Sequence, residues 1–271
     1  MAEYVWRHDL KGERARLRLM SDLLDPSSEF HLLRIGVAKG WHCLEIGAGN
    51  GSLSQWLAQR VGSEGHVIAS DIRTDLMKGI ESGNLEVRRL DVVHEDLPDA
   101  AYDLIAIRAL LHHLADRRAV VSKIVRWLKP DGWLFIQEPD FYPTWTVEPP
   151  SQKHFWEQFV QWAASHQIDY YVGRKIPVWL QAEGLLDIKS EGHAILYNGG
   201  SAFASWWDCG IREVADRLRT EGGVSQATLD EFFILCRDPT YWTTTIAFTA
   251  TTAQRPGGPV DPQGDQLGMT T

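Results

Sequence analysis

The chain has 271 residues, of which 44% are hydrophobic and 23% charged, and its net charge is −9. This acidic balance argues against nucleic acid as a partner, because binding a phosphate backbone needs clustered positive charge. No stretch is long and apolar enough to span a bilayer, and the first twenty residues lack the apolar core of a secretory signal. The three cysteines lack CxxC spacing, so neither a disulfide framework nor a zinc site is indicated. We therefore expect a reduced, cytoplasmic protein.

An N-terminal helix is expected first, with Leu17 and Leu19 turned toward the core. From residue 41 onward, strand-like and helix-like hydrophobic periods alternate. The expected strands are 41–47, 66–71, 85–91, 102–108 and 132–138, and the expected helices between them are 51–61 and 116–128. Strands separated by helices of this length predict βαβ units and a parallel sheet.

The pattern changes after residue 140. Between Phe141 and Trp207 lie 14 of the 28 aromatic residues. The remaining expected elements are an aromatic-striped helix over 154–162, a strand around 186–197, an irregular segment over 198–210, a helix over 225–238 and a strand over 241–252. Irregular, aromatic-rich insertions predict a lid that becomes ordered when ligands bind and that selects the substrate.

These features predict five parts of the chain. They are an N-terminal helical segment covering the cofactor site (1–40), a cofactor-binding Rossmann-like core (41–140), an aromatic lid insertion with a helix (141–184), the last two strands with a second lid segment (185–253) and a disordered tail (254–271).

The turn after the first strand reads Gly47-Ala48-Gly49-Asn50-Gly51, with Glu45 two residues ahead of it. In a parallel sheet the ligand binds beyond the carboxyl ends of the strands. A dinucleotide-binding loop would place its third glycine one residue later, as G-x-G-x-x-G. A carboxylate at Glu45 would oppose a pyrophosphate, and we expect it instead to pair with an ammonium group of the ligand.

The E-x-G-x-G-x-G string resembles the first motif of class I S-adenosylmethionine-dependent methyltransferases, in particular small-molecule enzymes of UbiE/COQ5-like type. The resemblance extends over residues 40–140 and more loosely over the last two strands. It implies an α/β fold with a doubly wound, seven-stranded, mostly parallel sheet and a helical, aromatic-rich lid after the fifth strand. It also implies S-adenosylmethionine as the cofactor and methyl transfer to an O, N or C atom of a small aromatic or hydrophobic metabolite.

In this family a carboxylate after the second strand binds the ribose, and one after the third strand binds the adenine amino group. The resemblance places Asp71 and Asp91 at these positions. The full set of cofactor contacts that it implies is Glu45, Gly47, Ala48, Gly49, Asn50, Gly51, Asp71, Ile72, Asp91, Val92, Arg108 and Ala109.

A base is needed only where the acceptor must lose a proton, and a neutral histidine suits that task. We expect His113 to act on the acceptor and His112 to point away, although a purely structural histidine is an equal alternative. Glu138 is a second catalytic candidate, expected with Asp140 to face the same cleft. No metal is predicted. The expected substrate contacts are Tyr4, Tyr142, Trp145 and Trp206.

Two other functions stay open on the sequence alone. Tyr171 and Lys175 match the Y-x-x-x-K pair of NAD(P)-dependent short-chain oxidoreductases, but the T-G-x-x-x-G-x-G loop of that family is absent. A protein of methyltransferase fold could also use its cofactor for a task other than methylation. The sequence does not decide whether the chain forms a homodimer.

Overall fold

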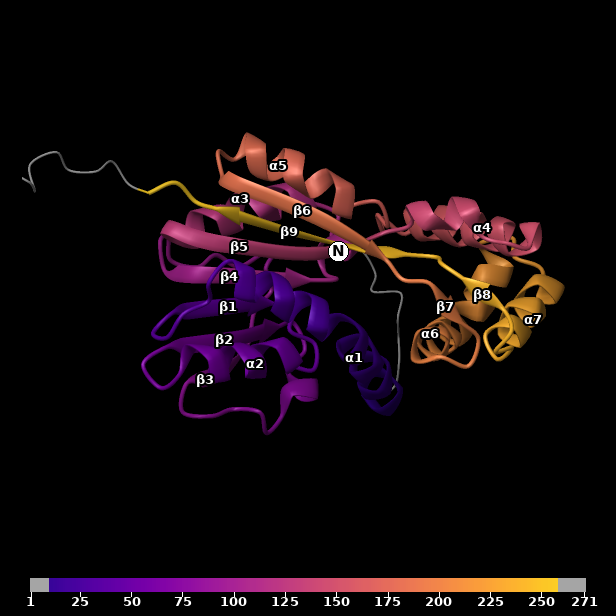
Figure 1. The fold of residues 1–271 in the computed structure, drawn as a ribbon, viewed down its shortest axis with the longest axis horizontal. Coiled ribbons are helices and arrows are strands. Elements are labelled where there is room, and N and C mark those ends of the chain that lie inside the picture. Colours follow the sequence, from indigo (N-terminus) through magenta and orange to yellow (C-terminus); the bar gives the residue numbers. More distant parts are fainter. Residues whose placement is uncertain (1–9, 258–271) are drawn as a thin grey trace, which may run out of the picture.

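The computed structural model describes residues 10–257, which leaves Tyr4 and the tail from residue 258 outside the described residues. A seven-stranded sheet in the order β3-β2-β1-β4-β5-β9-β6 forms its centre. The five strands from β1 to β5 run parallel, and β9 is antiparallel to both β5 and β6. The expected mostly parallel, seven-stranded sheet is therefore confirmed (Figure 1). The strands of this sheet are β1 His42–Ile46, β2 His66–Asp71, β3 Leu85–Arg89, β4 Tyr102–Arg108, β5 Leu128–Asp140, β6 Leu186–Ala194 and β9 Ala247–Gln254.

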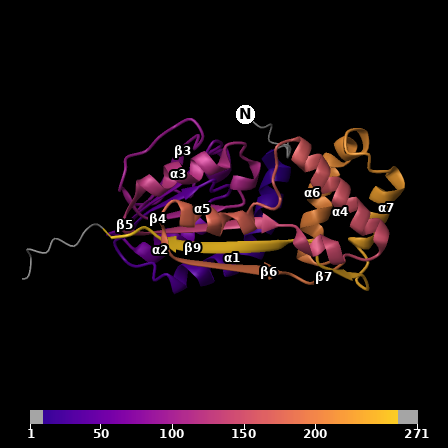
Figure 2. The same cartoon turned by 90° about the horizontal axis from the view of Figure 1, so that it is seen from above.

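Helices cover both faces of the sheet, as the apolar strands require. On one face lie α1 (Leu10–Arg34) and α2 (Ser52–Val61), and on the other lie α3 (Arg117–Trp127) and α5 (Ile176–Ala182), as Figure 2 shows. Side chains of β4 alternate between the two layers: Leu104 and Ala106 pack with α2, whereas Ile105 and Ile107 pack with α3. This alternation makes a core on each side of one sheet.

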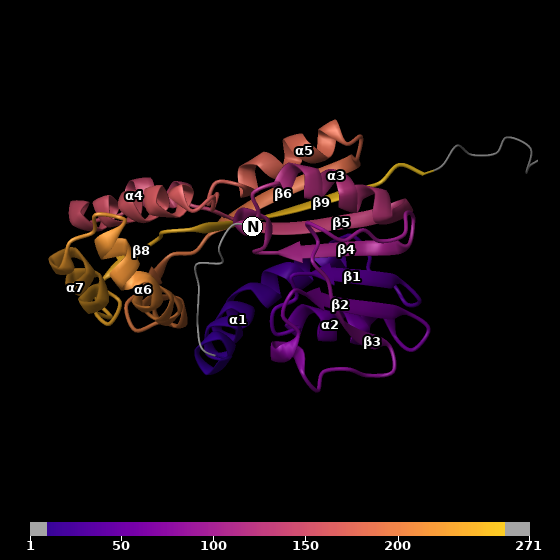
Figure 3. The ribbon, with the colours of Figure 1, turned by 180° about the vertical axis from the view of Figure 1, so that it is seen from behind.

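A helical lobe, here called the cap, lies at the end of the sheet where β5 and β6 finish (Figures 1 and 3). It has an aromatic core of its own, in which the ring centroids of Trp156 and Trp207 are 4.6 Å apart. The cap comprises α4 Pro150–Ser165, α6 Ala202–Thr220, α7 Gln226–Leu235 and the small sheet of β7 Tyr197–Asn198 with β8 Trp242–Thr243. Residues 10–257 also contain four short 3-10 turns: Asp75–Met77, Leu111–His113, Tyr142–Thr146 and Gly173–Lys175.

The expectation of an irregular lid segment at 198–210 was wrong, because α6 begins at Ala202. The Ser201 hydroxyl caps this helix by accepting a hydrogen bond from the Ala204 N–H at 3.2 Å. The strand expected around 186–197 and the strand expected over 241–252 are each divided, and their cap ends pair separately as β7 and β8. Most cap aromatic residues fill a packed core, which goes against a loosely ordered lid.

Candidate functional site

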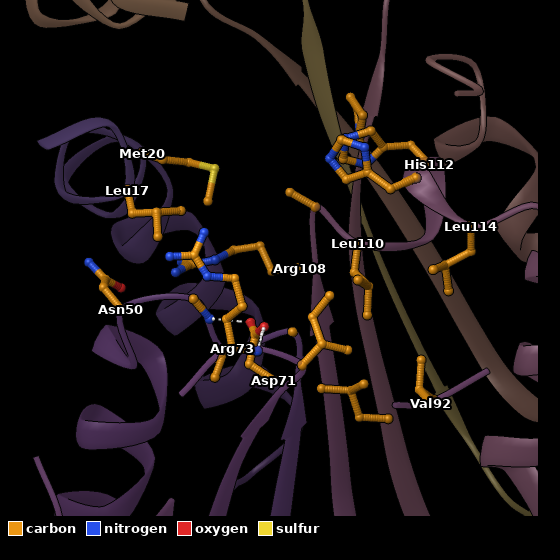
Figure 4. Close-up of a pocket in the computed structure, with 18 of the residues that line it drawn as sticks. Leu17, Met20, Asn50, Asp71, Arg73, Val92, Arg108, Leu110, His112 and Leu114 are labelled. Carbon is orange, nitrogen blue, oxygen red and sulfur yellow. Dashed lines mark hydrogen bonds between the residues drawn. The ribbon is translucent and has the colours of Figure 1, made fainter. Parts of the chain in front are cut away.

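A cavity of about 410 Å³ lies at the carboxyl ends of the parallel strands. This volume is within the range of small-molecule sites, about 300–1,000 Å³. Figure 4 shows Leu17 and Met20 of α1 on one side of it and His112 and Leu114 on the other. The segments that follow four neighbouring strands contribute to the wall: 46–50 after β1, 71–73 after β2, 90–94 after β3 and 108–116 after β4.

The glycine loop supplies the floor of the pocket nearest β1. Gly49 has a φ of +58°, and its N–H donates a hydrogen bond to Asp71 Oδ2 at 3.0 Å. Gly47, Ala48 and Asn50 also line the cavity. Gly51 does not line it, contrary to expectation: it caps α2 with a φ of +75°, and a Cβ there would lie 2.3 Å from Ile80 Cδ1. Gly51 thus serves close packing rather than ligand contact.

Two carboxylates follow consecutive strands and line the same wall. Asp71 Oδ1 accepts a hydrogen bond from the Arg73 N–H at 3.0 Å, in addition to the one that its Oδ2 accepts from Gly49. Asp91 Oδ1 accepts from the Val93 N–H, also at 3.0 Å. These backbone contacts hold both carboxylates in place (Asp71 is drawn in Figure 4), and Ile72 and Val92 line the cavity beside them.

Glu45 is buried behind the loop, with 1% of its surface exposed, and it does not line the cavity. The Ser54 hydroxyl donates a hydrogen bond to its Oε2. Burial raises the pKa of Glu45 to about 7, although the positive charge of Arg108 opposes the shift. The expected contact between Glu45 and a ligand ammonium group is therefore not what the structure shows.

Arg108 joins the pocket to α1. Its guanidinium, only 4% exposed, pairs with Asp25 and donates to the hydroxyls of Ser28 at 3.3 Å and Ser52 at 3.2 Å. Ala109, the next residue, also lines the cavity, with a φ of +50°. The guanidinium thus connects the end of β4 with α1 and with the first residue of α2.

The first turns of α1 line the pocket, which the sequence analysis did not resolve to residues. Glu13 and Arg16 are buried there, and the Arg16 guanidinium contacts both Glu13 carboxylate oxygens, at 2.8 and 2.9 Å. Leu17 and Met20 follow on the same wall. The available signal was the spacing of Glu13 and Arg16, which puts an opposite-charge pair on one face of the helix.

His112 and His113 both line the cavity, and their ring centroids are 3.8 Å apart. The expectation that His112 points away was therefore wrong. Glu138 lies behind it with no exposed surface and accepts hydrogen bonds from the N–H groups of Leu110 at 2.8 Å and Leu111 at 2.7 Å. Its Oε2 also lies 2.8 Å from His112 Nδ1 and 3.3 Å from the His112 N–H.

The pKa values of this pair move in opposite directions for the same reason. Burial disfavours the charged form of each group, which lowers the pKa of His112 to about 3 and raises the pKa of Glu138 to about 7. Glu138 was expected to face the cleft, but it does not line the cavity. Asp140, expected beside it, is paired with Arg174 at 2.6 and 2.7 Å and lies outside the cavity as well.

Aromatic side chains from the cap and from the segment after α4 close the far end of the pocket. Trp206 lies there as expected for a substrate contact, whereas Tyr142 and Trp145 are 47% and 71% exposed and do not line the cavity. No residue of their 3-10 turn, Tyr142–Thr146, lines the cavity, so the substrate role expected for them is not supported. Four apolar or aromatic residues that the sequence analysis missed complete this end: Tyr170, Trp207, Ile246 and Phe248.

The arrangement of glycine loop, two strand-end carboxylates and a β5-β9-β6 edge defines the cofactor-binding fold of class I methyltransferases. Residues 44–136 match the family described as the methyltransferase domain. The ubiquinone/menaquinone biosynthesis C-methyltransferase UbiE of Pseudoalteromonas translucida (strain TAC 125) is 33% identical over 111 residues, which cover 38% of this chain and 44% of the relative. Residues 44–136 therefore carry a methyltransferase domain whose sequence is similar to that of the UbiE C-methyltransferases. The chain spans about half the length of the curated relatives that it matches.

Two solved structures show that the fold extends beyond this core. Phosphoethanolamine N-methyltransferase 2 of Haemonchus contortus, in complex with phosphomonomethylethanolamine and S-adenosylhomocysteine, has a TM-score of 0.55 at 17% identity, covering 85% of this chain and 52% of that one. The [4+2]-cyclase SpnF has a TM-score of 0.51 at 16% identity, with 86% and 81% covered. Because one of these folds belongs to a cyclase, the likeness establishes the fold and not the reaction.

Proposed function

We propose that the chain transfers a methyl group from S-adenosylmethionine to a small, hydrophobic or aromatic acceptor. The observation that carries this proposal is a single cavity that joins two chemically different ends. One end holds the glycine loop with Asp71 and Asp91, and the other holds Trp206, Trp207 and the two histidines.

The residues at the first end fit the cofactor. The loop from Gly47 to Asn50 has no large side chain pointing into the space where a methionyl group would lie, apart from Asn50. Asp71 retains acceptor capacity for ribose hydroxyls, because its oxygens accept backbone hydrogen bonds from Gly49 and Arg73 while a carboxylate offers about four acceptor positions. Asp91 and the half-exposed Ile72 would hold the adenine ring.

Bound S-adenosylmethionine supplies an electrophilic methyl group on a sulfonium. The protein's part is to hold the acceptor in line and exclude water, which can itself lower a barrier by several kcal/mol. The apolar walls of Trp207, Ile246 and Phe248 exclude water at the acceptor end. They also favour a planar or apolar acceptor, since such rings bury large apolar area.

His112 and His113 are the candidate bases for an acceptor that must lose a proton. The contact with Glu138 favours His112. When the carboxylate is ionised it accepts a hydrogen bond from Nδ1–H, so Nε2 is the nitrogen that can take a proton. His113 stays a candidate because it lines the same wall. Glu138 acts in this proposal as a positioning residue.

The proposed function is tested by cofactor binding and by product formation. Calorimetry should show binding of S-adenosylmethionine and of S-adenosylhomocysteine, with no heat from NAD or NADP. Radioactive methyl from labelled cofactor should then pass into organic-extractable hydroquinone or phenol acceptors. Saturable NAD binding would favour the oxidoreductase reading, and cofactor binding without transfer to any acceptor would favour a non-methylating role.

The oxidoreductase alternative has little support in the pocket. Neither Tyr171 nor Lys175 lines the cavity, and the Lys175 ammonium pairs with Asp169.

No helix in residues 10–257 is long and apolar enough to cross a membrane. The cytoplasmic location expected from the cysteine pattern is kept as part of this proposal.

Replacing Asp71 with alanine should weaken S-adenosylmethionine binding by about 1–3 kcal/mol, because ribose hydroxyls would lose their acceptor. This corresponds to a roughly 5- to 150-fold rise in Kd at 25 °C. Asp99→Ala is the matched control, since Asp99 is 62% exposed and lies outside the cavity. If Asp71→Ala bound S-adenosylmethionine as tightly as the control does, Asp71 would not be a cofactor contact.

A further inference from the structure

A second group of chemically capable side chains lies away from the pocket. His31 of α1 and Glu191 and His193 of β6 each offer a ligand atom, and these atoms lie within 4.8 Å of one another. None of the three residues lines the cavity. His31 also lies eleven residues after Met20, which is about 16 Å farther along the helix. The group is thus separate from the cofactor site.

The topology brings these residues together for simple reasons. Glu191 and His193 are two positions apart on a strand, so their side chains leave the same face of the sheet. Helix α1 lies on that face, where the His31 ring stacks on Phe135 of β5 at 6.4 Å and lies 6.0 Å from the His193 ring. Because β6 is the edge strand, its end is also open to solvent.

His31 is the least expected member of the group. It is 5% exposed, and its Nε2 is buried without a hydrogen-bond partner among the described residues. A buried polar atom is normally satisfied by protein, water or an ion. An imidazole that has one unsatisfied nitrogen and lies beside a second histidine and a carboxylate can bind a further ligand.

Two charged side chains that pair with each other, Glu191 and Arg34, belong to or adjoin the group. Glu191 contributes one negative charge, and its Oε1 is held by Arg34 Nη1 at 2.5 Å. The second oxygen of Glu191 is left to act as a ligand. The Arg34 guanidinium fixes the orientation of the Glu191 carboxylate, as outer-shell partners of metal ligands commonly do. The Arg34 side chain is itself anchored over the Phe30 ring at 5.3 Å.

We propose that His31, Glu191 and His193 form a zinc site that fastens α1 to the edge strand β6. Two imidazoles and one carboxylate are a known ligand set for Zn²⁺, with a water in the fourth position. Ligands of a tetrahedral zinc site lie about 3.4 Å apart, so small side-chain rotations close the present spacing. The site runs against the expectation of no metal, which was based on Glu138 and Asp140. The N-terminal half of α1, from Glu13 to Met20, lines the cofactor pocket.

The test is a titration of the full-length, tag-free protein with Zn²⁺ after treatment with a chelator and without S-adenosylmethionine. One equivalent of Zn²⁺ should bind and raise Tm. His193→Ala should weaken binding at least tenfold and abolish the rise in Tm. This variant is preferred over one at His31 because His193 is exposed, so folding is expected to survive its removal, which circular dichroism can verify. Glu191→Gln should weaken binding as well.

His154→Ala is the matched control, because His154 is 67% exposed, lies on α4 and pairs only with a surface glutamate. It should bind Zn²⁺ as the wild type does. Cobalt substitution adds a spectroscopic reading: the visible absorption of tetrahedral Co²⁺ should appear in the wild type and vanish in His193→Ala. Equal Zn²⁺ affinity in the wild type and His193→Ala, or no binding by the wild type, would overturn the proposal while leaving methyl transfer unaffected.

Discussion

His112→Gln should lower the rate of methyl transfer by about 10²–10⁴-fold for an acceptor that must lose a proton, the usual contribution of a positioned base. Affinity for S-adenosylmethionine should change little, because His112 lies beyond the glycine loop and both strand-end carboxylates. His113→Gln is the matched comparison, since its ring lies 3.8 Å from the ring of His112, whose Nδ1 is in hydrogen-bond contact with Glu138. A larger loss in the His113 variant would transfer the role to that residue.

The pH dependence of the rate should separate a positioned base from a structural histidine. With a pKa of about 3, His112 stays neutral across the working range, so Glu138 is the group that titrates. As pH falls through about 7, Glu138 becomes protonated, and its O–H can then donate a hydrogen bond to His112 Nδ1. This favours the neutral tautomer that carries its proton on Nε2, which can no longer accept a proton there. The rate should therefore fall below about pH 7. In Glu138→Gln the decrease in rate below pH 7 should disappear, and most of the rate should be lost at every pH. A decrease that persisted in this variant would contradict the role assigned to Glu138.

Glu45→Gln should change how stability depends on pH. The pKa of Glu45 rises from 4.5 to about 7 on folding, so its contribution is fully present below about pH 4.5 and is lost as pH rises through about 7. The shift corresponds to a loss on the order of 3 kcal/mol. Glutamine cannot ionise, so the variant should lose less stability than the wild type between pH 5 and 8.

Urea unfolding at these two pH values measures the effect. Glu138 titrates over the same window in both proteins, so only the difference between wild type and variant reports on Glu45. Glu64→Gln is a suitable control because Glu64 is an exposed residue of the turn before β2. Parallel stability changes in wild type and Glu45→Gln would show that Glu45 stays ionised in the folded protein.

The core of the fold could be predicted because its signals are local. Alternating apolar runs and helical periods placed β2 and β4 at their observed bounds, 66–71 and 102–108. In α6 the same signal was present, with buried apolar residues at 203, 207, 211, 214 and 218. The paired glycines at 199 and 200, together with Gly210, concealed it. The first two precede the helix, and Gly210 lies within it without breaking it.

The site was predictable only where a residue's position follows from the end of a strand. Asp71 and Asp91 line the cavity because parallel strands end at one edge. Glu45 and Glu138 lie on strands too, but the face and depth of a strand residue depend on what packs behind it. Ser54 and the turn at 110–112, respectively, draw these carboxylates away from the cavity. The contribution of α1 to the pocket wall depends on tertiary packing, which no local sequence pattern encodes.

The cap meets the sheet at four separate passages of the chain, near residues 141, 170, 195 and 246. A lobe joined through one linker can rotate about that hinge, but a lobe joined at four points moves only if all four connecting segments bend together. Widening of the pocket for an incoming acceptor is therefore expected at α1, where Glu13 to Met20 form a wall on a single helix. Exchange of one cap for another would meanwhile alter acceptor choice without disturbing strand order, so this architecture suits diversification of substrate on a constant cofactor platform.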